Sequence, residues 1–471
     1  MRSASIFALA LLTACTVGPD YKAPDIGLPA SWFVPAAPKI TTDAKAEIDQ
    51  AWWQHFNDPV LSQLIDKAAA GNFDLKIAEA RIAEARAARG TARADLLPTA
   101  NIVSNNERQA NRIAFPGFTG LTKPFNTFED GFDASWELDI FGGKKRALES
   151  SSAELEAAMA SRDDARVSLM AEVARTYVDI RQYQQQLVLT TDTVKAEQNT
   201  VSIVGERYHT GNTSQLDVTQ AKAQLEQMQS QLPYYQNLLA QAEYSLDVLL
   251  GEQPGAAHAL VASTKPVPVS AIELVLAAPA NIIANRPDVR MAERELAAAT
   301  AQQGQAIAQL FPDISLSGFV GLLNVNSSHL LEAGSKSWDV GGNVLWPILN
   351  YGKLSANIDA ADARQQEALA SYQKSIISAL SDVAKSVTAY SRQEEFRRAL
   401  NKTVADNRES TAIARSRYRE GLSTFLDVLD AERTLYASES QLAQASAQTS
   451  QNLIAVYKSL GGGWAGQTPQ P

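Results

Sequence analysis

The chain has 471 residues, of which 45% are apolar and 20% charged, with a formal net charge of −10 and a pI of about 5.1. The acidic balance argues against nucleic acid or anionic lipid headgroups as the main partner, because both require clustered Lys and Arg. A single cysteine excludes an internal disulfide framework and a thiolate metal cluster, and no uninterrupted apolar run is long enough to predict a membrane-spanning helix.

The first predicted element is a secretory signal. Arg2 supplies a positive charge, and the apolar stretch that follows is too short to span a membrane. The sequence LTAC at residues 12–15 resembles the bacterial lipobox, and Thr16 in the next position points, in that system, to the outer membrane. We therefore expect residues 1–14 to be a signal peptide and Cys15 to be the lipidated N-terminus. The alternative is a structural or free thiol after an ordinary signal peptide.

The rest of the chain is a tandem repeat. The sequence RYHTGNTSQLDV, starting at Arg207, matches RYREGLSTFLDV, starting at Arg417, which lies 210 positions further on. The same offset pairs Leu250 with Leu460. The predicted organisation is a signal peptide at 1–14, a lipidated segment and lead-in at 15–75, a first repeat at 76–280, a second repeat at 281–461, and a C-terminal tail at 462–471.

Each repeat is predicted to contain a hairpin of two very long helices. Almost no helix-breaking residue lies between Gly143 and Gly211. Apolar residues recur there every three or four positions, as in a coiled-coil seam: Met170, Val173, Tyr177, Ile180 and Leu187. We expect Gly211 and Gly421 to lie in the hairpin turns, with the second pair of helices at about 353–418 and 424–460.

Ahead of each hairpin the apolar period changes to two, which predicts strands. The alternation is clear at 128–140, 313–320 and 338–346, and a weaker strand starts at about Thr99. Strands with one apolar face, one polar face and aromatic ends are typical of transmembrane strands around a wet lumen, and a half-buried soluble sheet is the alternative. We expect lipid contact at Trp136, Trp338 and Trp346, and water contact at Asp133, Glu137 and Asp339.

Four strands cannot close a barrel, so identical copies related by cyclic symmetry are needed. Three copies would give a barrel of twelve strands and twelve long helices, although two or four copies would also close. The pattern therefore predicts an oligomer without fixing its number.

Six stretches of the chain resemble the TolC-like outer-membrane factors, in particular the OprM/NodT-type efflux lipoproteins. The stretches are CTVGPDYKAP at Cys15, AWWQHFNDPVLSQLI at Ala51, WELDIFGGKKR at Trp136, RPDVRMAERELAAA at Arg286, QLFPDISLSGFVG at Gln309, and YREGLSTFLDVLDAERTLYASESQL at Tyr418.

This resemblance implies a mixed α and membrane-β fold. Each protomer would give four transmembrane strands to a trimeric 12-stranded β-barrel, which a long periplasmic α-helical barrel continues. The homotrimer would be lipid-anchored in the outer membrane and extend into the periplasm. It would dock on a periplasmic adaptor and an inner-membrane pump of the RND type, and conduct the pump's substrates to the exterior as part of a tripartite efflux system.

The resemblance also implies a gate at the periplasmic entrance. Asp427 and Asp430 match two positions where the family has an Asp lining the closed entrance, and Leu426 matches an apolar ring. Arg433 shares a helix face with Leu426 and Asp430 by its spacing. A simpler interpretation is that the two carboxylates stabilise a helix start through the macrodipole.

A latch between neighbouring hairpins is implied at Asp217 and Tyr418. TolC adds an Arg to this latch, and this chain has Ser423 at the corresponding position. The latch is therefore expected to be weaker or to use Arg417, Arg419 or Arg433 instead.

No catalytic arrangement stands out in the sequence. The four histidines, His55, His209, His258 and His329, are scattered, and no metalloprotease, nucleophile-elbow or P-loop motif is present. We expect no enzyme activity, no cofactor and no bound metal. Two alternatives remain open: a channel for type I protein secretion, and a structural coiled-coil surface lipoprotein.

Overall fold

The computed structural model describes residues 16–34, 40–43, 46, 48–110, 114–115, 118–119, 124–270 and 272–464. They form two compact units. Unit 1 comprises 16–25, 81–159 and 291–373, and unit 2 comprises 26–80, 160–290 and 374–464. The elements, in chain order, are β1 (Ile40–Thr42), η2 (Trp52–Phe56), α2 (Pro59–Gly71), α3 (Phe73–Ala94), β2 (Thr99–Gln109), β3 (Ala114–Phe115), β4 (Phe118–Thr119), β5 (Phe125–Glu137), α4 (Gly143–His209), α5 (Gln215–Leu250), α6 (His258–Val261), β6 (Leu274–Leu276), α7 (Pro279–Asn285), α8 (Pro287–Ala308), β7 (Asp313–Asn324), η3 (Ser327–His329), η4 (Ala333–Ser335), β8 (Lys336–Leu345), α9 (Tyr351–Arg419) and α10 (Phe425–Ser459).

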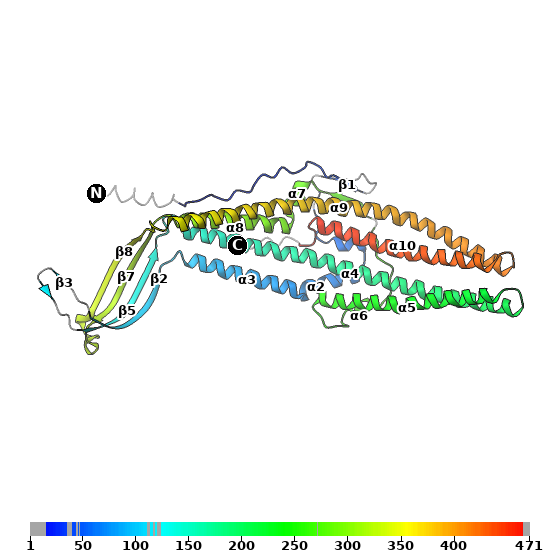
Figure 1. Ribbon diagram of the computed structural model, residues 1–471, viewed down its shortest axis with the longest axis horizontal. Helices are drawn as coiled ribbons and strands as arrows, with labels where there is room; N and C mark the ends of the chain where they lie inside the picture. Colours follow the sequence, from blue (N-terminus) through cyan, green and yellow to red (C-terminus); the bar gives the residue numbers. More distant parts are fainter. Residues whose placement is uncertain are drawn as a thin grey trace. The chain divides into compact units, whose positions relative to one another are not determined.

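Unit 1 contains an antiparallel four-stranded sheet in the order β2-β5-β7-β8 (Figure 1). Asp133 pairs with Phe319, which pairs in turn with Asp339. On the neighbouring rung, Phe132 pairs with Val320. Residues directly opposite one another project to the same face of a sheet, so this register keeps the two carboxylates on one face. A strand lies at each of the four predicted places, but β5 ends at Glu137 and does not extend to residue 140 as predicted.

The apolar face of this sheet is exposed in the single chain. The exposed fraction is 79% for Ile102 and 76% for both Trp338 and Val340. Large apolar side chains seldom gather on a surface that faces only water. The described residues of one chain leave this apolar face uncovered.

The long helices are confirmed as well. Helix α4 has 67 residues and α9 has 69, so each is about 100 Å long at 1.5 Å per residue. Four of the five residues of the predicted seam are buried in unit 2: Met170, Val173, Tyr177 and Ile180. Among the described residues, no helix combines the length and the apolar composition needed to cross a lipid bilayer.

The core of unit 2 is built around an aromatic cluster. Trp52 is fully buried and stacks on Tyr457, with ring centroids 5.4 Å apart and an angle of 9° between the rings. Trp53 and Phe56 meet Trp52 edge to face. The lead-in segment therefore packs directly on the last helix of the second repeat. The boundary predicted at residue 76 lies within α3.

Candidate functional site

The candidate site lies at the hairpin turns of unit 2. The turn between α4 and α5 and the turn between α9 and α10 lie at the same end of this unit (Figure 1). A small apolar core, here called the tip cluster, joins the two hairpins just behind the turns: Val204, Val218, Ala221, Tyr418, Phe425, Val428 and Leu429. The tip cluster fixes the two turns next to each other.

Both turns are built in the same way. Gly211 has φ 75° and Gly421 has φ 78°, the left-handed conformation that favours glycine. Asp217 then accepts hydrogen bonds from the backbone and side chain of the N-cap Ser214, at 3.0 and 2.9 Å. A reciprocal capping box of this kind satisfies two backbone donors that a helix start leaves unpaired. Hydrogen bonds from the Thr213 hydroxyl and from Ser214 hold the pKa of Asp217 below its usual range.

The second turn gives Asp427 the same role. Its carboxylate accepts from the backbone and hydroxyl of the N-cap Thr424, at 2.9 and 2.8 Å, and these bonds lower the pKa of Asp427. The structure therefore contains the contact that the simpler interpretation requires, since this carboxylate caps the start of α10. The side chain is still exposed to solvent and remains available for a second role.

The predicted gate residues are partly brought together. Leu426, Asp427 and Asp430 line one surface groove of about 900 Å³, and Leu426 is 63% exposed. Arg433 is not among the residues that line this groove; its Nε donates to Gln224 Oε1 at 2.8 Å. The groove therefore carries both predicted carboxylates and the predicted apolar residue, but its lining also includes the cationic Arg417. Arg433 connects α10 to α5 instead.

The predicted latch residues occupy different surroundings within the protomer. Asp217 is used in its own capping box, while Tyr418 is 5% exposed and its ring packs in the tip cluster. Arg207 Nη1 donates to the Tyr418 carbonyl oxygen at 2.6 Å, and the guanidinium lies 4.6 Å from the centre of the ring. Arg207, which the sequence did not single out, therefore ties α4 to α9. The Tyr418 hydroxyl is buried without a partner among the described residues.

A buried polar group beside the tip cluster was not predicted from the sequence. It contains the buried side chains of Glu197 on α4, Gln224 on α5 and Glu432 on α10, together with the partly exposed Arg415 of α9, which pairs with Glu432. A signal was available for Glu197, because it shares the helix face of the buried Val194 and Val204. A carboxylate on an apolar stripe marks a group that must find a partner inside the protein.

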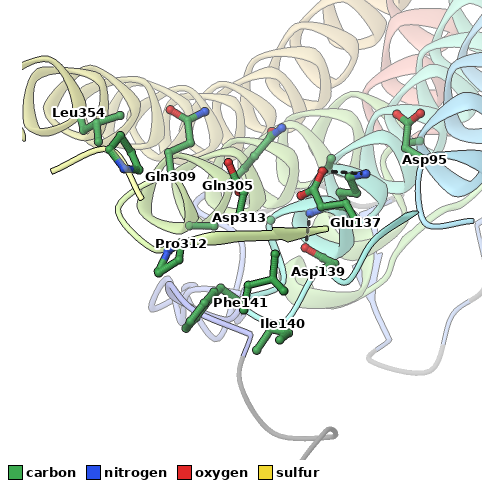
Figure 2. A pocket seen from close by; sticks show the side chains of 17 residues that line it. Asp95, Glu137, Asp139, Ile140, Phe141, Gln305, Gln309, Pro312, Asp313 and Leu354 are labelled. Carbon is green, nitrogen blue, oxygen red and sulfur yellow. Dashed lines mark hydrogen bonds and ion pairs between the residues drawn. The ribbon is translucent and has the colours of Figure 1, made fainter. Parts of the chain in front are cut away.

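A second cavity, of about 480 Å³, lies in unit 1 where the strands give way to helices. Figure 2 shows Glu137, Asp139 and Asp313 at this cavity. The Lys144 ammonium pairs with Glu137 at 2.9 Å, and the backbone amides of Lys144 and Lys145 each donate to Asp139 at 2.9 Å. Asp139 thus caps the start of α4. In the described part of the chain no group of three or more His, Cys, Asp or Glu side chains is arranged to hold a metal ion.

Cys15 and the predicted signal peptide lie outside the described residues. The chain immediately after Cys15 is held against unit 1. The Val17 amide donates to the Phe141 carbonyl oxygen at 3.1 Å, and the buried Arg146 donates to the carbonyl oxygens of Val17 and Gly18. The residue that would carry the lipid is therefore followed by a segment bonded to the start of α4.

Comparison with known proteins agrees with this architecture. A family model described as "Outer membrane efflux protein" matches residues 64–252 and 278–462. The toluene efflux pump outer membrane protein TtgI of Pseudomonas putida is 32% identical over 474 residues, with 98% of each chain covered. Nodulation protein T of Rhizobium leguminosarum bv. trifolii is 30% identical over 456 residues, with 96% of each chain covered.

The fold also matches a solved structure, that of the outer-membrane channel OprN. The TM-score is 0.89 at 33% sequence identity, and the match covers 96% of this chain and 100% of the OprN chain. The family model covers well over half of the sequence and takes in most of both repeats. The chain therefore belongs to the outer membrane efflux protein family.

Proposed function

We propose that the protein is the outer-membrane channel of a tripartite efflux system. As a member of this family it is a transport protein and not an enzyme. In the proposal it conducts substrates, delivered by an inner-membrane pump and a periplasmic adaptor, across the periplasm and the outer membrane to the exterior. The relative TtgI bears the name of a toluene efflux pump outer membrane protein, which supports this assignment of the class.

The observation that carries the proposal is the sheet β2-β5-β7-β8. Its exposed apolar face and its opposite acidic face fit strands placed between lipid and a water-filled lumen. Strands β2 and β8 are the two edges of the sheet, and lipid does not tolerate unpaired edges. We infer that three protomers close a 12-stranded barrel, which makes the channel a homotrimer.

The long helices supply the periplasmic part in this proposal. Helices α4 and α9, each about 100 Å long, would line up as a helical barrel in the trimer. The hairpin turns at Gly211 and Gly421 would form its periplasmic end and face the adaptor and an RND-type pump. The division of the chain into two repeats, at 76–280 and 281–461, belongs to the same proposal.

The groove that contains Leu426, Asp427 and Asp430 is proposed as the gate. In this proposal Arg433 fixes the first turns of α10 to α5 through its hydrogen bond to Gln224. Threefold symmetry would place six carboxylates around one opening. Like charges brought close together attract cations. The Asp217–Tyr418 latch is proposed as a contact between neighbouring protomers, with Arg207 supporting Tyr418 from within its own protomer.

The test of the gate is single-channel conductance of the purified protein in a planar bilayer. A trivalent cation added on the periplasmic side should block the parent channel. The double variant Asp427→Asn/Asp430→Asn should be blocked at least about tenfold more weakly, since a loss of about 1.4 kcal/mol of attraction corresponds to a factor of ten. Asparagine at 427 keeps a side-chain oxygen for the Thr424 cap.

The matched control is Asp406→Asn, which removes an exposed carboxylate of α9 that lies outside the groove. This control should be blocked as strongly as the parent. If the cation blocks the double variant as strongly as the control, neither carboxylate is part of the gate. Asp427 would then have only its role in capping α10.

The lipid anchor at Cys15 is tested by mass spectrometry of the N-terminal peptide of the mature protein. We expect Cys15 to be the first residue and to carry acyl chains, because LTAC at residues 12–15 resembles the lipobox. Each CH₂ group of such a chain that enters the membrane contributes about 0.8 kcal/mol to attachment. An unmodified Cys15, or cleavage at another bond, would contradict the anchor. The variant Cys15→Ala behind a different signal peptide should still form trimers, since the strands hold the protein in the membrane.

A further inference from the structure

A buried polar network joins the two hairpins of unit 2 next to the tip cluster. Glu197 on α4 is 2% exposed and Glu432 on α10 is 5% exposed. Glu432 Oε1 accepts hydrogen bonds from Arg415 Nε at 2.7 Å and from Thr200 Oγ1 at 3.3 Å. The Glu432 carboxylate therefore connects α10 to α9 within its own hairpin and to α4 of the other hairpin.

Only one of the two carboxylates of this network is bonded directly to a cation. Glu432 pairs with Arg415, while Glu197 forms no ion pair among the described residues. Glu197 is hydrogen-bonded to Gln224, and Arg433, the other guanidinium at this place, donates to the same Gln224 at 2.8 Å. Two buried carboxylates thus share one directly bonded cation. A buried carboxylate without a cation is costly as an anion and is more stable when it takes up a proton.

The oxygen atoms point to the same conclusion. Oε2 of Glu197 and Oε2 of Glu432 are both buried and both lack a hydrogen-bond partner among the described residues. An ionised carboxylate can only accept hydrogen bonds, whereas a protonated one can also donate. A proton on Glu197 would turn its unpartnered oxygen from an acceptor without a donor into a hydroxyl group.

The titration of Glu197 falls in an accessible range. Burial, followed by the nearby charge of Glu432, raises the pKa of Glu197 to about 7, against the lowering effects of Arg415, Arg433 and Gln224. These side chains come from α5, α9 and α10. The proton is therefore held in mildly acidic solution and lost in mildly alkaline solution.

We propose that the buried carboxyl group of Glu197 binds a proton beside the Glu432–Arg415 pair, and that this proton helps to hold hairpin α4–α5 against hairpin α9–α10. Without the proton, Glu197 and Glu432 are two buried negative charges on opposite hairpins, and their repulsion weakens the packing of one hairpin on the other. The site is a proton sensor placed directly behind the turns. The binding of the proton does not depend on the proposed channel function. The further claim, that the protonation state of Glu197 controls the width of the passage, rests on that function.

The direction of the effect follows from linkage. The pKa of Glu197 is about 7 in the packed hairpins, against an ordinary value of 4.5. The stabilisation that the proton gives to packing is therefore complete below pH 4.5 and is lost as the pH rises through 7. One proton changes the packing equilibrium by at most about tenfold per pH unit within that window. Separation of the hairpins, and with it opening, should increase as the pH rises and level off above about pH 8.

The first measurement is infrared difference spectroscopy of the purified full-length protein between about pH 5 and pH 9. The carbonyl band of a protonated carboxyl should disappear with a midpoint near 7, the value that burial gives Glu197. The band should be absent from Glu197→Gln and retained by Glu206→Gln, which removes an exposed carboxylate of the same helix. Glu432→Gln should move the midpoint downward, because the neighbouring negative charge is gone. A band that persists in Glu197→Gln, or that is missing from the parent, would overturn the proposal.

The second measurement is single-channel conductance over the same pH range. The parent and Glu206→Gln should open more often as the pH rises, while Glu197→Gln, which resembles the protonated form, should stay mostly closed at every pH. A titrating band combined with pH-independent gating would refute control of the passage by this proton. If the band titrates in a protein that forms no conducting pores at any pH, the channel function fails and the proton site stands.

Discussion

Replacing Val340 with arginine is expected to lower the free energy of unfolding by about 2–4 kcal/mol, the cost of a cationic side chain on the lipid face near the middle of a membrane. Val340 lies in the middle of β8, is 76% exposed and pairs with Gly318 on the apolar face of the sheet. The measurement is a denaturant titration of the protein refolded into lipid vesicles. The loss should shrink in detergent micelles, which adapt to a charged side chain.

The matched control is Asp339→Arg, one position earlier on the same strand. Asp339 pairs with Phe319 on the face that also carries Asp133, so its side chain should meet water. This variant should remain within about 0.5 kcal/mol of the parent, as ordinary surface substitutions do. Equal losses from the two variants would mean that the apolar face does not contact lipid.

Truncating Trp52 to alanine is expected to cost about 3–5 kcal/mol, the range for removing a large aromatic side chain from a packed core. Trp52 is fully buried and touches three aromatic rings, including the parallel stack on Tyr457 of α10. Because it joins the lead-in segment to the last helix, its loss opens a cavity that neither element can fill by moving alone. Thermal unfolding of the purified protein, followed by circular dichroism, measures the effect.

Phe33→Ala serves as the control for this substitution. Phe33 comes from the same lead-in region but is 98% exposed, so its truncation should change stability by no more than about 0.5 kcal/mol. A loss as large as that of Trp52→Ala would show that Phe33 is covered in the assembled protein. A small loss for Trp52→Ala would mean that the aromatic cluster is not needed for the stability of unit 2.

The parts of the fold that depend on local pattern were predictable from the sequence. The turns at Gly211 and Gly421 and the helices around them follow from uninterrupted apolar periodicity and from a residue that adopts positive φ. The division of the strand residues between the two faces of the sheet followed from alternation alone, because successive side chains of a strand point to opposite faces. In each case neighbouring residues carry the whole signal.

The contacts between hairpins were not predictable in the same way. Thr200 and Glu432 meet although they are 232 positions apart, and no local pattern specifies which residue of one helix faces which residue of another. The repeat itself misleads here. Tyr208 and Tyr418 are equivalent by the offset of 210, but the first is 41% exposed and the second 5%. The two copies have diverged in their packing while keeping the same capping residues, Asp217 and Asp427.

The open sheet has a consequence for how the molecule is made. Strands β2 and β8 each have a neighbour on one side only, so a solitary chain that entered the bilayer would carry two rows of unsatisfied amides and carbonyls into hydrocarbon. Insertion therefore requires that protomers associate first. Its rate should depend on protein concentration with an order greater than one. Dilution should stall refolding chains at the bilayer surface, in contrast to single-chain barrels, whose insertion is first order in protein.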